Sequence, residues 1–404
     1  MKILVISQYF WPENFRLNDL CIGLSDSGHE VVILTGLPNY PDGRVFSDFI
    51  ASPDAYSSLR NMNIIRVPLI PRGRSKFTLL LNYLSFMVSC SILGPLQLRK
   101  EKFDIVLVCQ LSPATVAIPA IIISKLKKTP LVMWVLDLWP DSLTAVGVVK
   151  SKRIMNFLQF IMNRIYQTCD LLIVQSKSFQ KRITELTNRR PLVTYIPTWA
   201  EEQFNQYEAN VRIDKIDEHF TVTFAGNIGI AQDVYCIIKA AKILKNHKDI
   251  IFNIVGDGRE AARVKKTIDD YGLSDTVKML GHHPLEKMPK FFGEADAMLV
   301  TLEKSETFAM TIPGKLQSYL AAGKPIIGAI DGEARRIIEE ANAGFCVSSG
   351  DYSGLAKNIL TMASMEPQKL AQLGQNGKLY SEKEFSREKI INKFVMNMEE
   401  VIQR

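Results

Sequence analysis

Short apolar runs recur along the chain, and each is followed by a turn and then by a longer stretch that is compatible with a helix. The first run, Lys2 to Ser7, leads into a loop, a helical stretch to about Ser27 and a second apolar run, Val31 to Thr35. Strands that are apolar throughout are typical of parallel sheets, because helices cover both faces of such sheets. The alternation therefore predicts an α/β fold with doubly wound parallel sheets.

The alternation runs in two series. In the first, further strands are expected at residues 63–67, 105–109, 131–136 and 170–175. A polar stretch, Glu201 to Glu218, precedes a second series with expected strands at residues 221–225, 250–255, 277–280, 297–301 and 325–330. A chain of 404 residues suffices for two domains, and we predict them at residues 1–199 and 200–383. The last helix, residues 384–404, has one apolar face, and we expect it to pack back on the first domain.

Composition excludes several classes of protein. A hydrophobic content of 47% and a mean hydropathy of +0.04 are those of a globular chain and not of a disordered one. The six cysteines form no Cys-x-x-Cys pair, which argues against structural zinc and fits a reducing cytoplasm. His282 and His283 lack an accompanying carboxylate cluster, so we expect a turn there and no metal site. The N-terminus enters a strand directly without an export signal, and we expect a cytoplasmic protein.

The formal net charge of +7 is unevenly distributed. Between Lys150 and Arg190 there are nine Lys or Arg residues but only two acidic ones. This stretch is either a solvated basic surface or a face that meets an anionic partner. No nucleic-acid-binding motif accompanies it, so we expect no nucleic acid partner.

The segment from Phe77 to Leu98 contains no charge over 22 residues, which is long enough to cross a bilayer. Its polar residues, its Gly94-Pro95 pair and the strands expected on both sides of it argue against a span. Basic residues flank the segment, namely Arg72, Arg74, Lys76, Arg99, Lys100 and Lys102. Two interpretations follow: a buried domain helix, or a helix that lies on an anionic membrane surface.

Two glycine turns follow strands of the second series. Gly226-Asn227-Ile228-Gly229 comes after residues 221–225, and Gly256-Asp257-Gly258 comes after residues 250–255. Glycine allows backbone to approach a phosphate, although a tight turn without a ligand has the same pattern. Arg259 follows the second turn and adds a group that binds phosphate well.

A third phosphate-binding element is expected between Glu306 and Ile327. Pro313 and Gly314 introduce a short helix over residues 315–322, and Gly323 ends it before a strand. The N-terminus of such a helix attracts anions, and Lys315 adds a full positive charge there. Because the carboxyl ends of parallel strands meet at one edge of a sheet, this element and the glycine turns are expected to converge.

The first domain has a different pattern at its strand ends. The loop after Ile6 contains no glycine before Gly23, so the dinucleotide-binding fingerprint is missing and we expect no NAD there. The stretch from Asp137 to Asp141 instead places two carboxylates and Trp139 after a strand, a combination that suits a sugar. Alternatively, the carboxylates cap the next helix and Trp139 belongs to the core.

The loop after the first strand is expected to face the same crevice as residues 137–141. It contains Glu13, Asn14 and Arg16, and Arg16 has the charge to meet a phosphate.

These motifs resemble those of a known family. Phe224-Ala-Gly-Asn-Ile-Gly229, Val255-Gly-Asp-Gly258, Ala295-Asp-Ala-Met-Leu299 and Ile312-Pro-Gly-Lys-Leu316 with Leu320-Ala-Ala-Gly-Lys-Pro-Ile-Ile327 are similar to the donor domain of retaining GT-B glycosyltransferases of family 4, group 1 type. Gly28-His-Glu-Val31 and Asp137-Leu-Trp-Pro-Asp-Ser142 match the acceptor half, so the resemblance covers essentially the whole chain. With Pro12-Glu13, the set is most similar to bacterial O-antigen and capsule N-acetyl-L-fucosamine transferases.

The resemblance implies a GT-B fold, with two Rossmann-like doubly wound domains facing each other across a cleft. It also implies a UDP-sugar donor on the second domain, no cofactor beyond this substrate and no metal, because cationic side chains and helix N-termini neutralise the leaving diphosphate. The expected catalytic residues are Asp137 as base or sugar ligand, and Arg259 and Lys315 on the leaving group. The expected donor-binding residues are Gly226, Asn227, Gly229, Gln232, Gly256, Gly258, Gly281, His282, Glu306, Gly314, Leu316, Gln317, Ser318 and Glu333. The expected acceptor-binding residues are Glu13, Asn14, Arg16, Trp139 and Asp141.

One position departs from the family pattern. The family has two glutamates separated by seven residues, and the second, five residues before the glycine at 323, holds the ribose hydroxyls; this chain has Ser318 there. Glu306, which resembles the first glutamate, lies twelve residues before Ser318. Gln317, Ser318 or Glu333 is expected to take over the ribose.

We therefore predict a glycosyltransferase on the cytoplasmic face of the plasma membrane, peripherally associated with it. It would move N-acetyl-L-fucosamine from UDP to a polyprenyl-diphosphate-linked saccharide in O-antigen or capsule biosynthesis. Two alternatives remain: a GT-B nucleotide-sugar epimerase, and a non-catalytic degenerate subunit of a polysaccharide-assembly complex.

Overall fold

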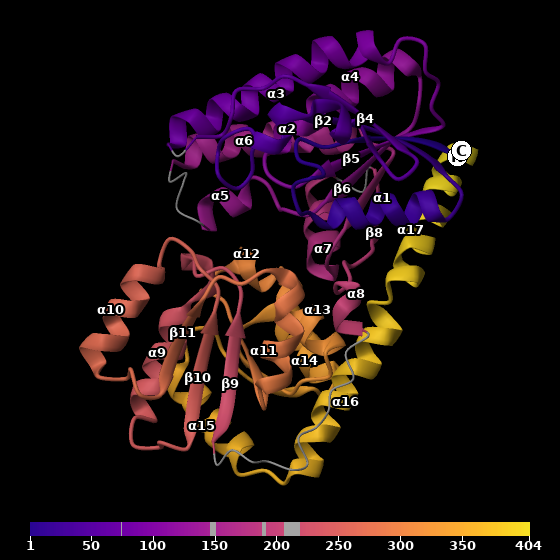
Figure 1. Ribbon diagram of the computed structural model, residues 1–404. Coiled ribbons are helices and arrows are strands. Elements are labelled where there is room, and N and C mark those ends of the chain that lie inside the picture. Colours follow the sequence, from indigo (N-terminus) through magenta and orange to yellow (C-terminus); the bar gives the residue numbers. More distant parts are fainter. Residues whose placement is uncertain (74, 146–150, 188–190, 206–218) are drawn as a thin grey trace. The chain divides into compact units, whose positions relative to one another are not determined.

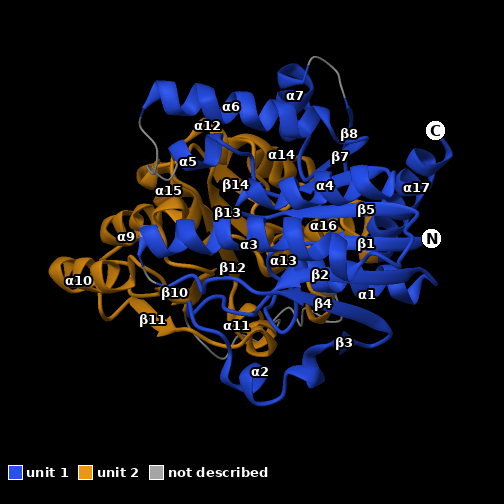
Figure 2. Ribbon diagram, turned by 90° about the horizontal axis from the view of Figure 1, so that it is seen from above, with its two compact units in different colours: residues 1–197, 388–404 blue, residues 198–387 orange. Residues whose placement is uncertain are grey.

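A computed structural model of the chain describes residues 1–73, 75–145, 151–187, 191–205 and 219–404. It forms two compact units, Met1–Pro197 with Glu388–Arg404, and Thr198–Arg387 (Figure 2). Several features noted above lie outside the described residues: Arg74, three of the basic residues between 150 and 190, and residues 206–218 of the polar stretch.

Unit 1 contains an eight-stranded sheet in the order β3-β4-β2-β1-β5-β6-β7-β8, in which the β3–β4 pair is antiparallel and the other pairs are parallel. Its strands are β1 (Lys2–Ile6), β2 (Glu30–Gly36), β3 (Ser58–Leu59), β4 (Met62–Val67), β5 (Ile105–Gln110), β6 (Leu131–Val135), β7 (Leu171–Val174) and β8 (Leu192–Tyr195). All residues of β5, β6 and β7 are buried, as expected for strands covered on both faces.

The helices of unit 1 surround this sheet. They are α1 (Arg16–Asp26), α2 (Ser47–Ala51), α3 (Lys76–Gln97), α4 (Ala117–Lys127), α5 (Asp141–Ala145), α6 (Lys152–Gln167) and α7 (Lys177–Leu186), and the last helix, α17 (Arg387–Gln403), joins them. Helices α3 and α4 lie side by side (Figure 1), where Gly94 of α3 closely approaches Ile123 of α4. The fully buried Phe394 of α17 meets the ring of Trp134 of β6 edge-on at 5.2 Å, so α17 belongs to the core of unit 1.

Unit 2 contains a six-stranded, wholly parallel sheet in the order β11-β10-β9-β12-β13-β14. Its strands are β9 (Phe220–Ala225), β10 (Ile250–Val255), β11 (Val277–Gly281), β12 (Ala297–Thr301), β13 (Ile326–Ala329) and β14 (Gly344–Val347). Its helices are α8 (Glu202–Asn205), α9 (Val234–Ile243), α10 (Ala261–Tyr271), α11 (Met288–Glu294), α12 (Glu306–Ala309), α13 (Gly314–Ala321), α14 (Gly332–Glu340), α15 (Tyr352–Ala363) and α16 (Pro367–Glu384). The prediction of two α/β domains with parallel sheets is confirmed.

Helix α13 lies one residue earlier at each end than predicted, at Gly314–Ala321 instead of residues 315–322. Pro313 precedes it in an extended conformation, and Gly323 follows it with a φ of +64°, a backbone conformation that favours glycine. The N–H of Gly323 donates to the carbonyl of Leu320 at 3.0 Å, which closes the last turn. The helix therefore presents its N-terminus at the edge of the sheet where β9 and β10 end.

Candidate functional site

The two glycine turns of unit 2 pack backbone against backbone. The N–H of Gly226 donates to the carbonyl of Val255 at 2.9 Å, and the N–H of Ile228 donates to the carbonyl of Asp257 at 2.8 Å. A Cβ atom at Gly256 would lie 1.9 Å from the carbonyl oxygen of Gly226, and one at Gly258 would lie 2.4 Å from that of Ile228. Close contact between the two turns therefore explains why residues 256 and 258 must be glycine. Together the turns form one continuous rim at the carboxyl ends of β9 and β10.

Lys315 reaches this rim from helix α13. Its Nζ donates to Oε1 of Gln232 at 2.5 Å and lies 3.8 Å from the centre of the Phe224 ring. A Cβ atom added to Gly226 would lie 3.0 Å from the same Nζ, so the ammonium rests directly on the first turn. Burial lowers the pKa of Lys315 to about 7. Among the residues that the structure describes, no carboxylate pairs with this ammonium, which leaves its charge to be balanced by an anion.

Helix α13 is fixed to the sheet by Tyr319. Its buried hydroxyl accepts the N–H of Ala225 at 2.9 Å and donates to the carbonyl of Ala225 at 3.1 Å. Ala225 is the last residue of β9, so the two bonds set the position of α13 beside the first glycine turn. Nothing in the sequence patterns identified this tyrosine.

The N-terminus of α13 adds to the positive potential of the site. Gly314 is its first residue and is exposed, with no atom within 4 Å of the place a Cβ would occupy. The free N–H groups of a first helical turn and the helix dipole favour an anion at this position. Lys315 and the helix terminus therefore present a cationic surface to the same rim.

The other expected donor residues lie around this rim. The carbonyl of Gly281 accepts the N–H of Gly256 at 2.8 Å, which brings the exposed end of β11, with His282, next to the second turn. Asn227, Gly229 and Gln232 belong to the first turn and the short 3-10 helix after it, and Arg259 is exposed beside the second turn. The structure brings these residues to one edge of the unit 2 sheet. Among the described residues, no group of three or more His, Cys, Asp or Glu is placed to hold a metal ion.

Three expected donor residues have buried side chains in this structure. Leu316 is fully buried, and its N–H donates to the carbonyl of Pro313 at 2.9 Å. Gln317 is also fully buried, and its amide forms two hydrogen bonds with Thr198, each 2.7 Å long. Glu333 is only 5% exposed, and its carboxylate pairs with Arg336 at 2.7 Å. In this structure Leu316 belongs to the core, Gln317 binds Thr198 and Glu333 pairs with Arg336.

Of the two residues that resemble or replace the family's glutamates, Ser318 is buried and Glu306 is exposed. Ser318 is 6% exposed, and its Oγ donates to Oε2 of Glu201 at 2.9 Å. Glu306 is exposed and begins the separate helix α12. The position where the family has its second glutamate thus holds a serine that is bonded to a carboxylate from another segment.

In unit 1, Asp137 lies just beyond the end of β6. Its Oδ2 accepts the indole N–H of Trp139 at 3.1 Å and the hydroxyl of Ser142 at 3.2 Å. Burial raises the pKa of Asp137 to about 6, partly offset by these bonds. Asp141 is the first residue of helix α5, and its Oδ2 forms an ion pair with Nε of Arg182 at 3.4 Å. Trp139 is half-buried.

Glu13, an expected acceptor-binding residue, is buried in this structure. It is 2% exposed, and its carboxylate accepts the N–H groups of Phe10 at 3.1 Å, Asn39 at 2.8 Å and Tyr40 at 2.7 Å. It therefore ties the loop after β1 to the loop after β2. Its neighbour Asn14 is exposed, and Arg16 is half-buried at the start of α1.

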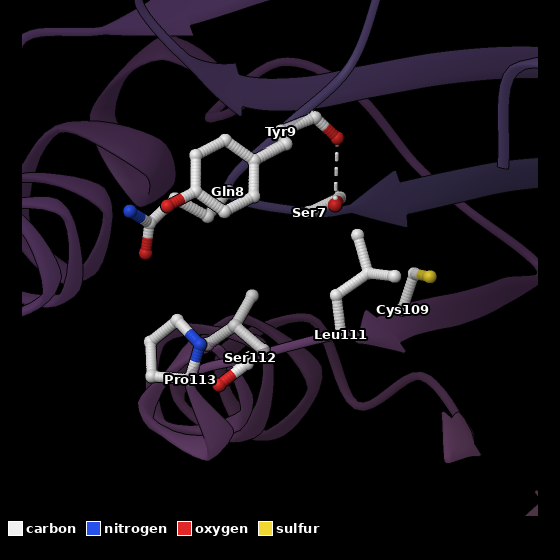
Figure 3. A pocket seen from close by; sticks show the side chains of 8 residues that line it. Ser7, Gln8, Tyr9, Cys109, Leu111, Ser112 and Pro113 are labelled. Carbon is white, nitrogen blue, oxygen red and sulfur yellow. Dashed lines mark hydrogen bonds between the residues drawn. The ribbon is translucent and has the colours of Figure 1, made fainter. Parts of the chain in front are cut away.

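A small hollow lies at the carboxyl ends of β1 and β5 (Figure 3). Ser7, Gln8, Tyr9, Leu111, Ser112 and Pro113 line it with Cys109 and Val116. Gln8 donates through its amide to Oδ1 of the buried Asn82 of α3 at 2.7 Å. This polar network was missed in the sequence, although Gln8 and Asn82 stand out as polar residues beside or within apolar runs.

Two family models and several relatives of this chain are glycosyltransferases. Residues 14–199 match the family described as glycosyl transferase 4-like domain, and residues 206–380 match glycosyl transferases group 1. The probable glycosyltransferase WbjE of Pseudomonas aeruginosa is 29% identical over 60% of this chain, and the match spans 62% of that protein's length. The putative colanic acid biosynthesis glycosyl transferase WcaI of Escherichia coli is 25% identical over 80% of this chain and 82% of its own.

Solved structures show the same fold. Sucrose-phosphate synthase of Thermosynechococcus elongatus superposes with a TM-score of 0.75 at 15% identity, over 100% of this chain and 99% of its own. Anabaena Alr3699/HepE in complex with UDP and glucose superposes with a TM-score of 0.68 at 17% identity, over 99% of both chains. The chain is therefore a glycosyltransferase with the GT-B fold, and its second half is a group 1 glycosyltransferase domain.

Proposed function

We propose that this enzyme takes its sugar from a UDP-sugar and binds the donor diphosphate at the rim formed by Gly226, Gly256 and Lys315. The observation that carries this proposal is the ammonium of Lys315, which has no carboxylate partner among the described residues and rests on a glycine turn. Solved structures of Alr3699/HepE contain UDP, in one case together with glucose, and these complexes support the choice of nucleotide.

The chemistry follows from the charges at the rim. When the bond between the anomeric carbon and the diphosphate oxygen breaks, negative charge develops on the leaving phosphate. Lys315, the N-terminus of α13 and the exposed Arg259 stabilise that charge, and we propose that no metal is needed for it. The anomeric carbon bonds to an acceptor hydroxyl, whose proton leaves with a base. Asp137 is our candidate for that base or for a ligand of the acceptor sugar.

We infer that the sugar is N-acetyl-L-fucosamine and that the acceptor is a polyprenyl-diphosphate-linked saccharide of a bacterial surface polysaccharide. Two relatives carry names from such pathways, the colanic acid protein WcaI and the amylovoran biosynthesis glycosyltransferase AmsK of Erwinia amylovora. These relatives support the class of product; the donor sugar follows from the motif resemblance.

An acceptor of this kind would be embedded in a membrane, and helix α3 suits a membrane surface. The described part of the chain contains one helix long and apolar enough to be a membrane-span candidate, Phe77–Gln97, and little of it is buried. One face of α3 packs inward through Asn82, Phe86, Cys90 and Gly94. The opposite face exposes Phe77, Leu80, Leu84, Val88, Ile92 and Leu96 to solvent. We propose that this exposed face lies on the cytoplasmic surface of the plasma membrane.

Transfer of labelled sugar to lipid tests the proposal. We expect radiolabel from UDP-N-acetyl-L-fucosamine to enter a lipid extract of cells that make the polysaccharide, and Lys315→Ala to slow this transfer by about 10²- to 10³-fold. Lys304→Ala is the control, since Lys304 is an exposed lysine of the same unit. A labelled product that stays attached to UDP would instead identify an epimerase. If no UDP-sugar raises the melting temperature of the protein, the non-catalytic alternative is favoured.

A further inference from the structure

Two adjacent residues of α13 hold a segment from the start of unit 2. The amide of Gln317 binds Thr198 twice, donating to its carbonyl and accepting from its Oγ1, both at 2.7 Å. Ser318 binds Glu201 through a 2.9 Å hydrogen bond from Oγ to Oε2. Both contacts bridge more than a hundred positions of sequence, so folding of unit 2 is needed to bring the carboxylate of Glu201 to α13.

The position of Glu201 relates it to the diphosphate site. The hydroxyl of Ser318 lies 3.3 Å from the carbonyl oxygen of Gly314, which is one helical turn nearer the N-terminus. Glu201 is therefore held on the Gly314 side of α13, near the helix terminus where the diphosphate is proposed to bind. In a nucleoside diphosphate the ribose is linked directly to the α-phosphate, so its hydroxyls lie within a short reach of that terminus.

A carboxylate is well suited to this place. Its two oxygens accept hydrogen bonds from both hydroxyls of a vicinal diol, as an acidic residue does for the ribose in dinucleotide-binding folds. The other polar residues considered for the ribose are engaged elsewhere, Gln317 with Thr198 and Glu333 with Arg336. Glu201 is half-buried, so the residue is not sealed within the core of unit 2.

We propose that Glu201 binds the ribose hydroxyls of the donor nucleotide, with Ser318 as the residue that positions it. The proposal rests on the function proposed above, since it requires a nucleoside diphosphate at the rim. The carboxylate of Glu201, which precedes β9 in the chain, thus takes the place of the carboxylate that α13 lacks at Ser318.

Nucleotides with and without ribose hydroxyls separate this role from diphosphate binding. We expect calorimetry to show that the wild-type protein binds UDP about tenfold more tightly than 2′,3′-dideoxy-UDP, the scale of one hydrogen bond to a charged group. In Glu201→Ala and Glu201→Gln the two affinities should approach each other. In Lys315→Ala both should weaken by a similar factor, and the preference for UDP should remain. Glu202→Ala, at an exposed neighbouring position, is the matched control and should leave both affinities unchanged.

An exchange variant tests the geometry. Glu201→Ser combined with Ser318→Glu keeps the same two side chains and places the carboxylate on the helix, and we expect it to regain the preference for UDP. Wild-type discrimination in a folded Glu201→Gln protein would overturn the proposal. Failure of the wild-type protein to bind UDP at all would overturn the proposed donor, and this inference with it.

Discussion

The Nζ of Lys315 lies 3.8 Å from the centre of the Phe224 ring, so a lysine on helix α13 and a phenylalanine on strand β9 meet at the rim of unit 2. The ring attracts the cation but also removes it from water. These opposing effects leave a lysine whose pKa is lowered to about 7, in a place where an anion would restore its charge.

The affinity of the wild-type protein for UDP should therefore depend on pH in a defined direction. Above pH 7 the amine of the free protein is mostly neutral, and it must take up a proton when the diphosphate binds. We expect the dissociation constant of UDP to rise with pH between 7 and 9, by up to about tenfold per unit. In Lys315→Arg the guanidinium stays protonated, so this rise should disappear.

Calorimetry in buffers of different ionisation enthalpy measures the proton uptake directly. A wild-type dissociation constant that does not change between pH 7 and 9 would refute the lowered pKa of Lys315.

Lys315→Ala should lower kcat/KM by about 10²- to 10³-fold, the usual effect of removing a group that stabilises charge developing in the transition state.

Tyr319→Phe tests the attachment of α13 to β9. The variant removes the hydroxyl that forms both hydrogen bonds with Ala225 and leaves buried backbone groups without them. We expect the unfolding free energy of unit 2 to fall by about 2 kcal/mol and the affinity for UDP to fall severalfold. Denaturant unfolding and calorimetry measure the two effects. Tyr271→Phe, at a half-buried tyrosine that ends α10, is the control and should change neither quantity.

Several of these features could be predicted from the sequence, and others could not. The bounds of β10 and β12 are those predicted, because buried strands in a parallel sheet are predominantly apolar and stand out from the polar turns beside them. The glycine turns and Lys315 also converge as their places after strands and before a helix predict. These are local patterns combined with one general property of parallel sheets.

The sequence did not reveal the contacts between distant segments. Leu316, Gln317 and Ser318 follow Lys315 directly, yet only the rotation of α13 about its axis decides which side chain faces the rim. That rotation is set by Tyr319 against Ala225, a contact across 94 positions of sequence. Glu13 is buried because backbone from residues 39 and 40 returns to its carboxylate. The bond between Ser318 and Glu201 spans 117 positions and has no local signature.

Glu13→Ala should expose the structural role of this residue. Three backbone N–H groups lose their acceptor, and we expect the unfolding free energy of unit 1 to fall by about 3 kcal/mol. Burial also raises the pKa of Glu13 to about 7, so its contribution to stability is largest at low pH and is lost as pH rises through 7. Denaturant unfolding at pH 5 and pH 8 measures both effects. Asn14→Ala, at the exposed neighbour, should be neutral, and equal stabilities of Glu13→Ala and wild type would contradict the assigned role.

Asp137 gives a prediction for the pH dependence of transfer. Because burial raises its pKa to about 6, the carboxylate form required of a base is lost below that pH, and kcat/KM should fall with it. Asp137→Asn keeps an acceptor for Trp139 and Ser142 but should lower kcat by about 10²-fold and remove the acid limb. Asp48→Asn, at an exposed site, is the control. An acid limb that survives in Asp137→Asn would assign it to another group.

The exposed face of α3 predicts binding to anionic lipid. Val88 and Ile92 lie near the middle of this face and are 50% and 59% exposed, while Arg99, Lys100 and Lys102 follow the helix as cations. Insertion of the apolar side chains and attraction of the basic ones should act together, so binding to phosphatidylglycerol vesicles should weaken as salt increases. We expect Val88→Gln with Ile92→Gln to lower vesicle binding in co-sedimentation by about tenfold or more, while UDP affinity stays unchanged. Ile243→Gln, at a residue of unit 2 with a similar exposure of 52%, should retain vesicle binding. Equal binding by the double variant and the wild type would show that α3 does not contact lipid.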